Sequence, residues 1–352
     1  MMKRYLALTA IVLSILVFAA CGTVSSQNES VESEVTRVEE QPLEEDVTPP
    51  SEVTIGHQTF STDVEELVLD AQLQSNQPLD LSLLKWCSNL KVLTVNLMVN
   101  PHVYFDEAGN IVVSEMAPVD LSPLAELDHL EDLCLNVGKV ADLAPLAQMS
   151  ALRQLCLVVD GAMDLSPLAN CARLEELVLE GSGSVDLAPL SRCAELNYLR
   201  LCVIDENGET PDLSDLSGAP KLETLSLAGH RGLAELKDVP LRCLYDLNHS
   251  TAILEELPKL STLETVQISD RYLTDISPLL ENETVKYLTL VVDTQAIPQT
   301  TIITADNRDL LDQLITGIEK DQLSEFLNRN DGSIMVFYDF NRTDGFSAYP
   351  AG

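Results

Sequence analysis

Leucines along this chain alternate with polar residues in a pattern that repeats. The spacing L-x-x-L-x-L begins at Leu130, Leu152, Leu174 and Leu196, so each occurrence starts 22 residues after the one before. Because successive side chains of a strand point to opposite faces, the last two leucines of each unit share one face and their neighbours share the other. The pattern therefore predicts short strands with one buried leucine face.

A second phrase, D-L-(S/A)-P-L, precedes these units at the same interval. It begins at Asp120, Asp142, Asp164 and Asp186, and it returns as D-I-S-P-L at Asp275. Proline lacks a backbone donor and restricts the residue before it, which favours a short turn or 3₁₀ segment over a long helix. We expect the recurring Asp to accept hydrogen bonds from backbone N–H groups of this turn, and we assign it no catalytic role.

Self-similarity at this period is typical of a solenoid, in which only stacked neighbours can bury the apolar face of one unit. A constant register requires parallel strands lying side by side, each joined to the next by a segment that covers the leucines. Core positions expected in successive strands are Leu67, Leu93, Leu133, Leu155, Leu177, Leu199, Leu225, Leu244, Val266 and Leu288. We therefore predict an α/β solenoid of about ten repeats over residues 54–300.

The two phrases resemble the leucine-rich repeats of the short 22-residue class typified by bacterial internalins. This resemblance implies a leucine-rich-repeat arc with a parallel β-sheet on its concave face and short 3₁₀ or turn segments on its convex face. The chain departs from the family pattern after the strand, where Gly138, Asp160 and Ser182 replace the usual buried Asn. Asp and Ser can hydrogen-bond a turn in a similar way, and Gly can adopt its backbone angles.

Two places inside the repeats depart from the regular period. An insertion within residues 97–118 contains the apolar runs Val103–Phe105 and Ile111–Val113 on either side of a Gly-Asn sequence, which predicts a β-hairpin. Near Leu244 the pattern degrades, because Asp246 occupies an expected core position. We expect a distorted repeat there.

Residues 301–352 lose the repeat. Leucine and isoleucine spacing predicts a helix over Asp306–Ile318, and a later apolar run predicts a strand over Ile334–Phe340. A segment of this length is too short for a separate catalytic domain, and a solenoid needs a polar cover over its last exposed core edge. We expect these residues to form a C-terminal α/β cap.

The N-terminus has the features of a bacterial export signal. Two basic residues precede the apolar run Leu6–Ala20, which is too short for a stable membrane span. The sequence Phe18–Cys21 resembles the lipobox of bacterial lipoproteins, which implies removal of residues 1–20 and lipid attachment to Cys21. A plain secretory signal is the alternative. Residues 21–53 are strongly acidic with little to bury, and we expect a disordered tether.

Charge limits the class of partner. The formal net charge is −35, and removal of residues 1–20 takes away two of the 21 basic residues and no acidic one, leaving −37. Nucleic acid and anionic lipid headgroups are poor partners for such a surface, so contact with the membrane is expected through the lipid anchor alone. Cationic segments or divalent ions fit its charge better.

The cysteines fall into two groups. Cys87, Cys171 and Cys193 each precede the first leucine of a repeat by three residues, which predicts a small buried core position. Cys134 and Cys156 occupy the same outward strand position one period apart. Neighbouring strands lie about 4.8 Å apart, so a disulfide between them is geometrically conceivable but strained by the in-register geometry. Whether it forms is left open.

No catalytic or cofactor motif is found in the sequence. The chain contains no G-x-S-x-G elbow, no phosphate-binding loop and no G-x-G-x-x-G. None of the five histidines has metal-ligand spacing: His57, His102, His129, His230 and His249. We therefore expect neither an enzyme, nor a metal site, nor a cofactor.

The outward strand positions are the remaining candidates for function. On the concave face we expect Glu176, Glu180, Tyr198 and Arg200 to contact a ligand, and on the inserted hairpin Tyr104 and Phe105. Aromatic and Arg side chains are the usual anchors of protein interfaces. The alternative for Tyr104 and Phe105 is that they fold back over the leucine edge of the second repeat.

Together these features predict a monomeric, lipid-anchored, non-enzymatic recognition module exposed at the bacterial cell surface. Its expected ligand is a protein or a glycan bound by the repeat arc. The alternative function is a structural or scaffolding lipoprotein of the cell envelope. An internalin-like adhesion role rests on family resemblance alone.

Overall fold

The computed structural model describes most of the chain from residue 49 onward. Its described residues are 49–74, 78–100, 103–105, 111–113, 117–229, 231–246, 251–268, 273–292, 300–315, 317–329 and 332–338. The predicted signal sequence, Cys21 and nearly all of the predicted tether lie outside them. Within this part of the chain, no helix is long and apolar enough to cross a membrane.

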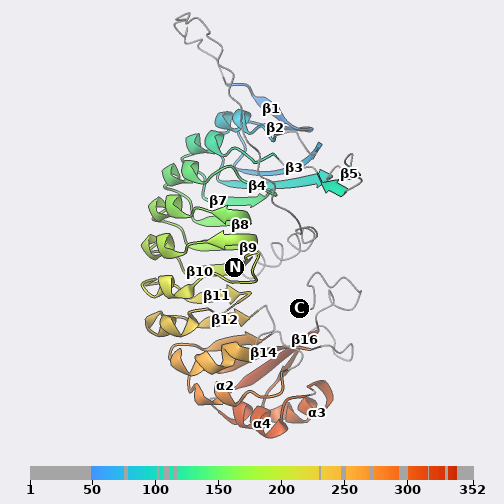
Figure 1. Ribbon diagram of the computed structural model, residues 1–352, viewed down its shortest axis with the longest axis vertical. Coiled ribbons are helices and arrows are strands. Elements are labelled where there is room, and N and C mark those ends of the chain that lie inside the picture. Colours follow the sequence, from blue (N-terminus) through green and yellow to red (C-terminus); the bar gives the residue numbers. More distant parts are fainter. Residues whose placement is uncertain are drawn as a thin grey trace, which may run out of the picture.

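Twelve strands form one continuous sheet, and Figure 1 shows them stacked along the long axis with short helical segments on the opposite side. Every neighbouring pair is parallel except β15 with β16. In spatial order the strands are β15 (Thr300–Ile303), β16 (Ser333–Tyr338), β14 (Tyr287–Val292), β13 (Thr265–Ile268), β12 (Cys243–Asp246), β11 (Thr224–Leu227), β10 (Tyr198–Ile204), β9 (Glu176–Val185), β8 (Gln154–Met163), β7 (Asp132–Asn136), β4 (Val92–Asn100) and β3 (Glu66–Gln74).

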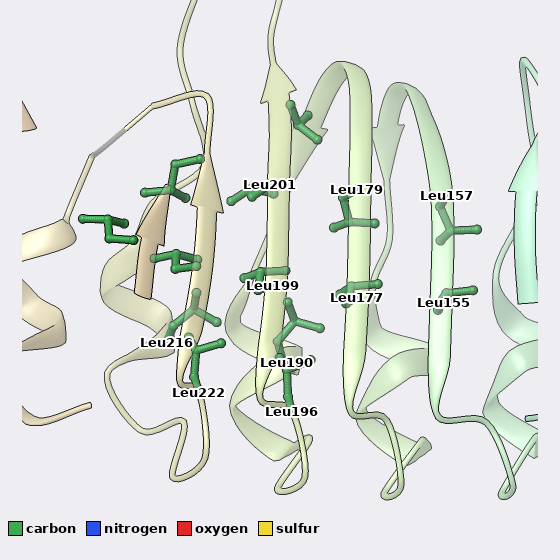
Figure 2. Packing of buried hydrophobic residues seen from close by; sticks show 14 of the residues in the cluster. Leu155, Leu157, Leu177, Leu179, Leu190, Leu196, Leu199, Leu201, Leu216 and Leu222 are labelled. Carbon is green, nitrogen blue, oxygen red and sulfur yellow. The ribbon is translucent and has the colours of Figure 1, made fainter. Parts of the chain in front are cut away.

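The ten predicted core positions lie in one unbroken row across this sheet. Each pairs in register with the next, and each is at most 8% exposed. Figure 2 shows Leu155, Leu177 and Leu199 projecting from three neighbouring strands to the same side. Full burial of one such side chain contributes about 1.5–3 kcal/mol to stability, and the row forms one side of an apolar core that the leucines of the return segments complete. The predicted register is confirmed.

Short helical segments return the chain between strands. Those between β3 and β14 are η2 (Ser82–Trp86), η3 (Ser122–Glu126), η4 (Ala144–Gln148), η5 (Ser166–Asn170), η6 (Ala188–Arg192), η7 (Leu213–Leu216), η8 (Leu233–Asp238), η9 (Thr251–Lys259) and α2 (Ser277–Glu281). In five of them the Pro of the repeated phrase lies in the first turn, where its missing N–H costs no helical hydrogen bond. The prediction of short return segments is confirmed, and the fold is a leucine-rich-repeat solenoid.

The repeated Asp stabilises the turns that carry the phrase. Its carboxylate accepts a hydrogen bond from the backbone N–H two residues later at 2.8–2.9 Å, as predicted, at Asp120, Asp142, Asp164, Asp186 and Asp275. Asp80 and Asp212 make the same bond in repeats that lack the full phrase. The recurring carboxylate is thus a structural group.

Cys87, Cys171 and Cys193 are buried, as predicted. The thiol of Cys171 donates to the Leu146 carbonyl of the preceding return segment, and Cys193 donates to that of Leu168. Asn282 occupies the same place in a later repeat, where its Nδ2 donates to the carbonyls of Leu257 at 2.6 Å and Leu260 at 3.0 Å. This position therefore links neighbouring repeats through a side-chain donor.

The repeat near Leu244 is irregular, as expected, but its strand is not. Strand β12 keeps the common register, with Asp246 paired to Leu227 and Ile268 and only 2% exposed. The irregularity lies instead in the return segment that follows, because η9 is nine residues long and contains Pro258. The parallel neighbours on both sides hold the strand in register.

The predicted hairpin is present: β5 (Val103–Phe105) pairs antiparallel with β6 (Ile111–Val113). A further hairpin, β1 (Glu52–Ile55) with β2 (Gln58–Ser61), precedes β3, and its first two residues fall inside the predicted tether.

The helix predicted over Asp306–Ile318 is wrong as one element. The chain forms η10 (Ala305–Leu310), the short α3 (Leu311–Leu314) and then α4 (Lys320–Asn328). Ile315 is extended and Gly317 has a φ of 101°, so a helix cannot continue through them. The predicted last strand is β16, which pairs in parallel with β14 and extends the repeat register through Ile334.

Substitutions at two adjacent residues, Leu155 and Gln154, test which face of β8 is buried. Leu155→Asp places a charge among the stacked leucines, and we expect it to lower the free energy of unfolding by several kcal/mol. Gln154→Asp, on the outward face, should cost less than about 0.5 kcal/mol. Equal losses in thermal and denaturant melts would contradict the assigned faces.

The turn carboxylates predict how stability depends on pH. Hydrogen bonds from backbone N–H groups lower the pKa values of Asp120, Asp164, Asp212 and Asp275. Their stabilising effect is therefore complete above the ordinary Asp pKa of about 3.9 and is lost as pH falls through the lowered values. Replacing all four by Asn keeps the acceptor oxygen but removes the titration. Melting temperatures between pH 2 and 5 should fall less steeply for this variant than for the wild type, and parallel curves would refute the prediction.

Candidate binding surface on the concave face

Outward side chains of neighbouring strands form regular rows on the concave face. Paired residues place Asp132, Gln154, Glu176 and Tyr198 in one row, Cys134, Cys156, Val178 and Arg200 in the next, and Val158, Glu180 and Cys202 in a third. Parallel strands lie about 4.8 Å apart, so side chains in a row contact one another. Four predicted site residues, Glu176, Glu180, Tyr198 and Arg200, are thereby brought together on β9 and β10.

The centre of this surface is an ion pair between adjacent strands. Nε of Arg200 donates to Oε1 of Glu180 at 2.5 Å, and the two side chains are 29% and 14% exposed. Burial lowers the pKa of Arg200, but the neighbouring Cys202 and Glu180 outweigh burial, so its pKa is raised overall. The guanidinium is thus fixed in position and permanently charged at a partly dry site.

Two outward tyrosines belong to the same surface. Tyr198 lies on β10 with Arg200, and burial raises the pKa of its phenol. Tyr245 on β12 pairs with Ser226 and Gln267, and burial raises its pKa to about 12. Both phenols stay neutral at physiological pH and can donate a hydrogen bond. Tyr245 was missed at the sequence level, although its outward position in a strand could have identified it.

A ladder of polar side chains continues the surface towards the N-terminal repeats. Asn96 Nδ2 donates to Asp70 Oδ1 at 2.8 Å, and Asn136 Nδ2 donates to Asn96 Oδ1 at 2.7 Å. Asn136 Oδ1 in turn accepts a weak hydrogen bond from the Cys134 thiol, at 3.8 Å. The ladder crosses β3, β4 and β7 and ends beside the cysteine row.

The seven cysteines that the structure describes are all free thiols. Cys134 and Cys156 lie opposite each other in register, as predicted, without a disulfide between them. Cys202 and Cys243 also face the concave side, on β10 and β12. Among the described residues, no three His, Cys, Asp or Glu side chains are close enough together to hold a metal ion.

Tyr104 and Phe105 lie in β5, paired with Val112 and Ile111. The hairpin starts directly after β4, and Figure 1 shows it beyond the end of that strand. These two residues are therefore carried by a separate two-stranded sheet, and their part in binding stays a prediction.

Most other basic side chains near the sheet are already engaged. Just before the strands, Lys91 pairs with Glu65 at 2.9 Å, Arg153 with Glu175 at 2.8 Å, and Arg242 with Glu264 at 2.9 Å. These pairs are exposed to solvent, which screens the attraction between their charges. Arg200 is distinguished from them by its burial and by its place on the concave face.

Solved structures with similar folds include two internalins of Listeria monocytogenes. One internalin is 19% identical, covering 74% of this chain and 69% of its own, with a TM-score of 0.41. Internalin C2 is 17% identical over 66% of this chain and 84% of its own, with a TM-score of 0.34. The mouse RP105/MD-1 complex is 17% identical over 73% and 47%, with a TM-score of 0.43. No family model and no curated protein matches this chain.

Proposed function

We propose that this chain is a non-enzymatic recognition module that binds a protein ligand on the concave face of β8–β12. The observation that carries this proposal is the half-buried Glu180–Arg200 ion pair of β9 and β10, with Tyr198 on the same strand as Arg200 and Tyr245 in the Arg200 row on β12. Tyr and Arg are enriched among the residues that dominate protein interfaces. Polar groups that are already partly dehydrated lose less solvation when a partner covers them.

The scaffold supports this role because the sheet is held from the opposite side by the continuous leucine row. Side chains on the concave face are therefore fixed before binding, and little conformational entropy is lost when the ligand docks. An arc also offers a long surface without needing a deep pocket. The tests below distinguish a protein ligand from a glycan ligand.

We further propose that residues 1–20 are removed, that a lipid on Cys21 anchors the protein at the cell surface, and that residues 21–53 act as a tether. In this arrangement the arc stands away from the membrane. Residues 301–352 are proposed to cap the last repeat, because β16 covers β14 and continues its register. An envelope scaffold would share this anchoring but would bind partners of its own membrane.

Substitution on the concave face tests the binding proposal. Full-length wild-type protein and the variant Tyr198→Ala/Arg200→Ala are used to capture partners from host surface extract and from bacterial envelope extract. We expect the variant to bind the captured partner at least tenfold more weakly, about 1.4 kcal/mol, at a temperature well below its melting transition. Its melting temperature should fall, because the largely buried Glu180 carboxylate loses its partner. Tyr198→Ala alone, which leaves the ion pair in place, should show part of the loss.

Arg242→Ala serves as the matched control, because it removes an exposed cation outside the concave face. Separate deletion of Tyr104 to Val113 tests the hairpin. Unchanged binding by both the double variant and the deletion would refute the concave-face assignment. Capture from host extract alone supports recognition, capture from the envelope alone supports the scaffold, and loss of capture after glycan oxidation identifies a glycan.

Substitution of the lipobox cysteine tests the anchor. Cys21→Ala should abolish metabolic labelling with a lipid precursor, because the thiol that would carry the lipid is gone. The protein should then leave the membrane fraction or accumulate as an uncleaved precursor. Undiminished labelling would refute lipid attachment at Cys21. Secretion of the wild-type protein without lipid would support the plain secretory signal.

A further inference from the structure

Two thiols face each other in the N-terminal half of the concave face. Cys134 on β7 and Cys156 on β8 are direct partners in the parallel register. Adjacent strands lie about 4.8 Å apart, within the range of roughly 4.4–6.8 Å between Cα atoms that a disulfide can span. The two side chains point to the same side of the sheet, so both sulfur atoms lie on one face, and the bond between them would carry the strain of the in-register geometry.

No other described cysteine has this arrangement. Cys202 is opposite Glu180, and Cys243 lies between Thr224 and Thr265. Cys171 and Cys193 are buried under the return segments, donate to backbone carbonyls, and have pKa values raised to about 11 by burial. Their thiols are unreactive at neutral pH, because the thiolate is the nucleophile and a raised pKa keeps the thiol protonated.

The surroundings of the pair make its two members unequal. Cys134 is half-buried and contacts Asn136, whereas Cys156 is 7% exposed. A hydrogen bond from the Cys156 thiol lowers the pKa of Cys134, and the same bond, together with burial, raises the pKa of Cys156. Cys134 is the more exposed of the two, so a reagent from solvent reaches it first.

We propose that Cys134 and Cys156 form a thiol–disulfide exchange site, with Cys134 as the attacking and Cys156 as the resolving cysteine. The co-reactant is a low-molecular-weight disulfide, RSSR. The Cys134 thiolate attacks one sulfur, forming a mixed disulfide and releasing RS⁻. The Cys156 thiol loses its proton and displaces the second RS⁻, which closes the Cys134–Cys156 bond. RSSR is reduced by two electrons, and the cysteine pair is oxidised by two.

This proposal is independent of the ligand-binding proposal, because it concerns a bond within the chain. Its direct test is oxidation of the full-length protein by mixtures of oxidised and reduced glutathione, followed by acid quench and peptide mass spectrometry. We expect the free thiols of Cys134 and Cys156 to disappear together, and the peptide linked by their disulfide to appear, under conditions that leave Cys171 and Cys193 reduced. Two independent glutathione adducts at Cys134 and Cys156 would overturn the proposal.

Single variants assign the roles. Cys156→Ser should accumulate a stable glutathione adduct at Cys134, because the resolving thiol is missing. Cys134→Ser should leave Cys156 unmodified, and Cys202→Ser should close the Cys134–Cys156 bond like the wild type. A Cys156→Ser protein without an adduct at Cys134 would refute the assignment.

Reaction rates give a readout that a purely structural role would not move. Alkylation of wild-type Cys134 by iodoacetamide should be about tenfold faster at pH 7 than that of Cys202, whose pKa burial raises to about 11. The rate should also level off at a lower pH than for an ordinary thiol. Equal rates at the two cysteines would contradict the attacking role.

Discussion

The lateral stacking of leucines from neighbouring repeats is the interaction on which this structure depends. No single repeat can bury Leu155 and Leu157; both are covered only because β7 and β9 present leucines at the same height. A slip of one residue in any strand would turn its leucines to solvent and its outward residues into the core. The apolar core therefore fixes the register, and the register fixes every position on the concave face.

The recurring hydrogen bonds and ion pairs of polar side chains follow from that register. The Asp of each turn and the donors at the Cys171 and Asn282 positions recur because the return segment recurs, and each satisfies backbone groups that the narrow turn leaves unpaired. Likewise, the ion pairs before the strands join residues that register already places side by side. Being exposed, they are a consequence of the stacking and contribute little to it.

The sequence was sufficient to predict the strands and their register wherever the same spacing of leucines was repeated. Leu133 to Leu199 define strands because four copies show the same spacing, and β12 follows even though Asp246 breaks its pattern. Elements that occur once were harder to predict. The place of α4 depends on hydrogen bonds to residues distant in sequence, around α2. Gln322 accepts from the Ile276 N–H and donates to Asp275. Arg329 donates to the backbone carbonyls of Leu280 and Asn282. Likewise, the outward rows were predicted, but the burial that singles out the Glu180–Arg200 pair and Tyr245 was not, because it depends on side-chain packing.

The ends of the sheet show why the candidate surface lies in the middle. At β3 the free edge is bonded by one side chain, since Gln58 accepts from the Asp70 N–H at 2.7 Å and donates to the Val68 carbonyl at 3.3 Å. At the other end, β15 runs antiparallel and stops the repeat. Between these ends, β4 and β7–β14 each have a parallel neighbour on both sides. The candidate surface on β8–β12 lies well inside this stretch, where neighbouring strands hold each outward row in place from both sides.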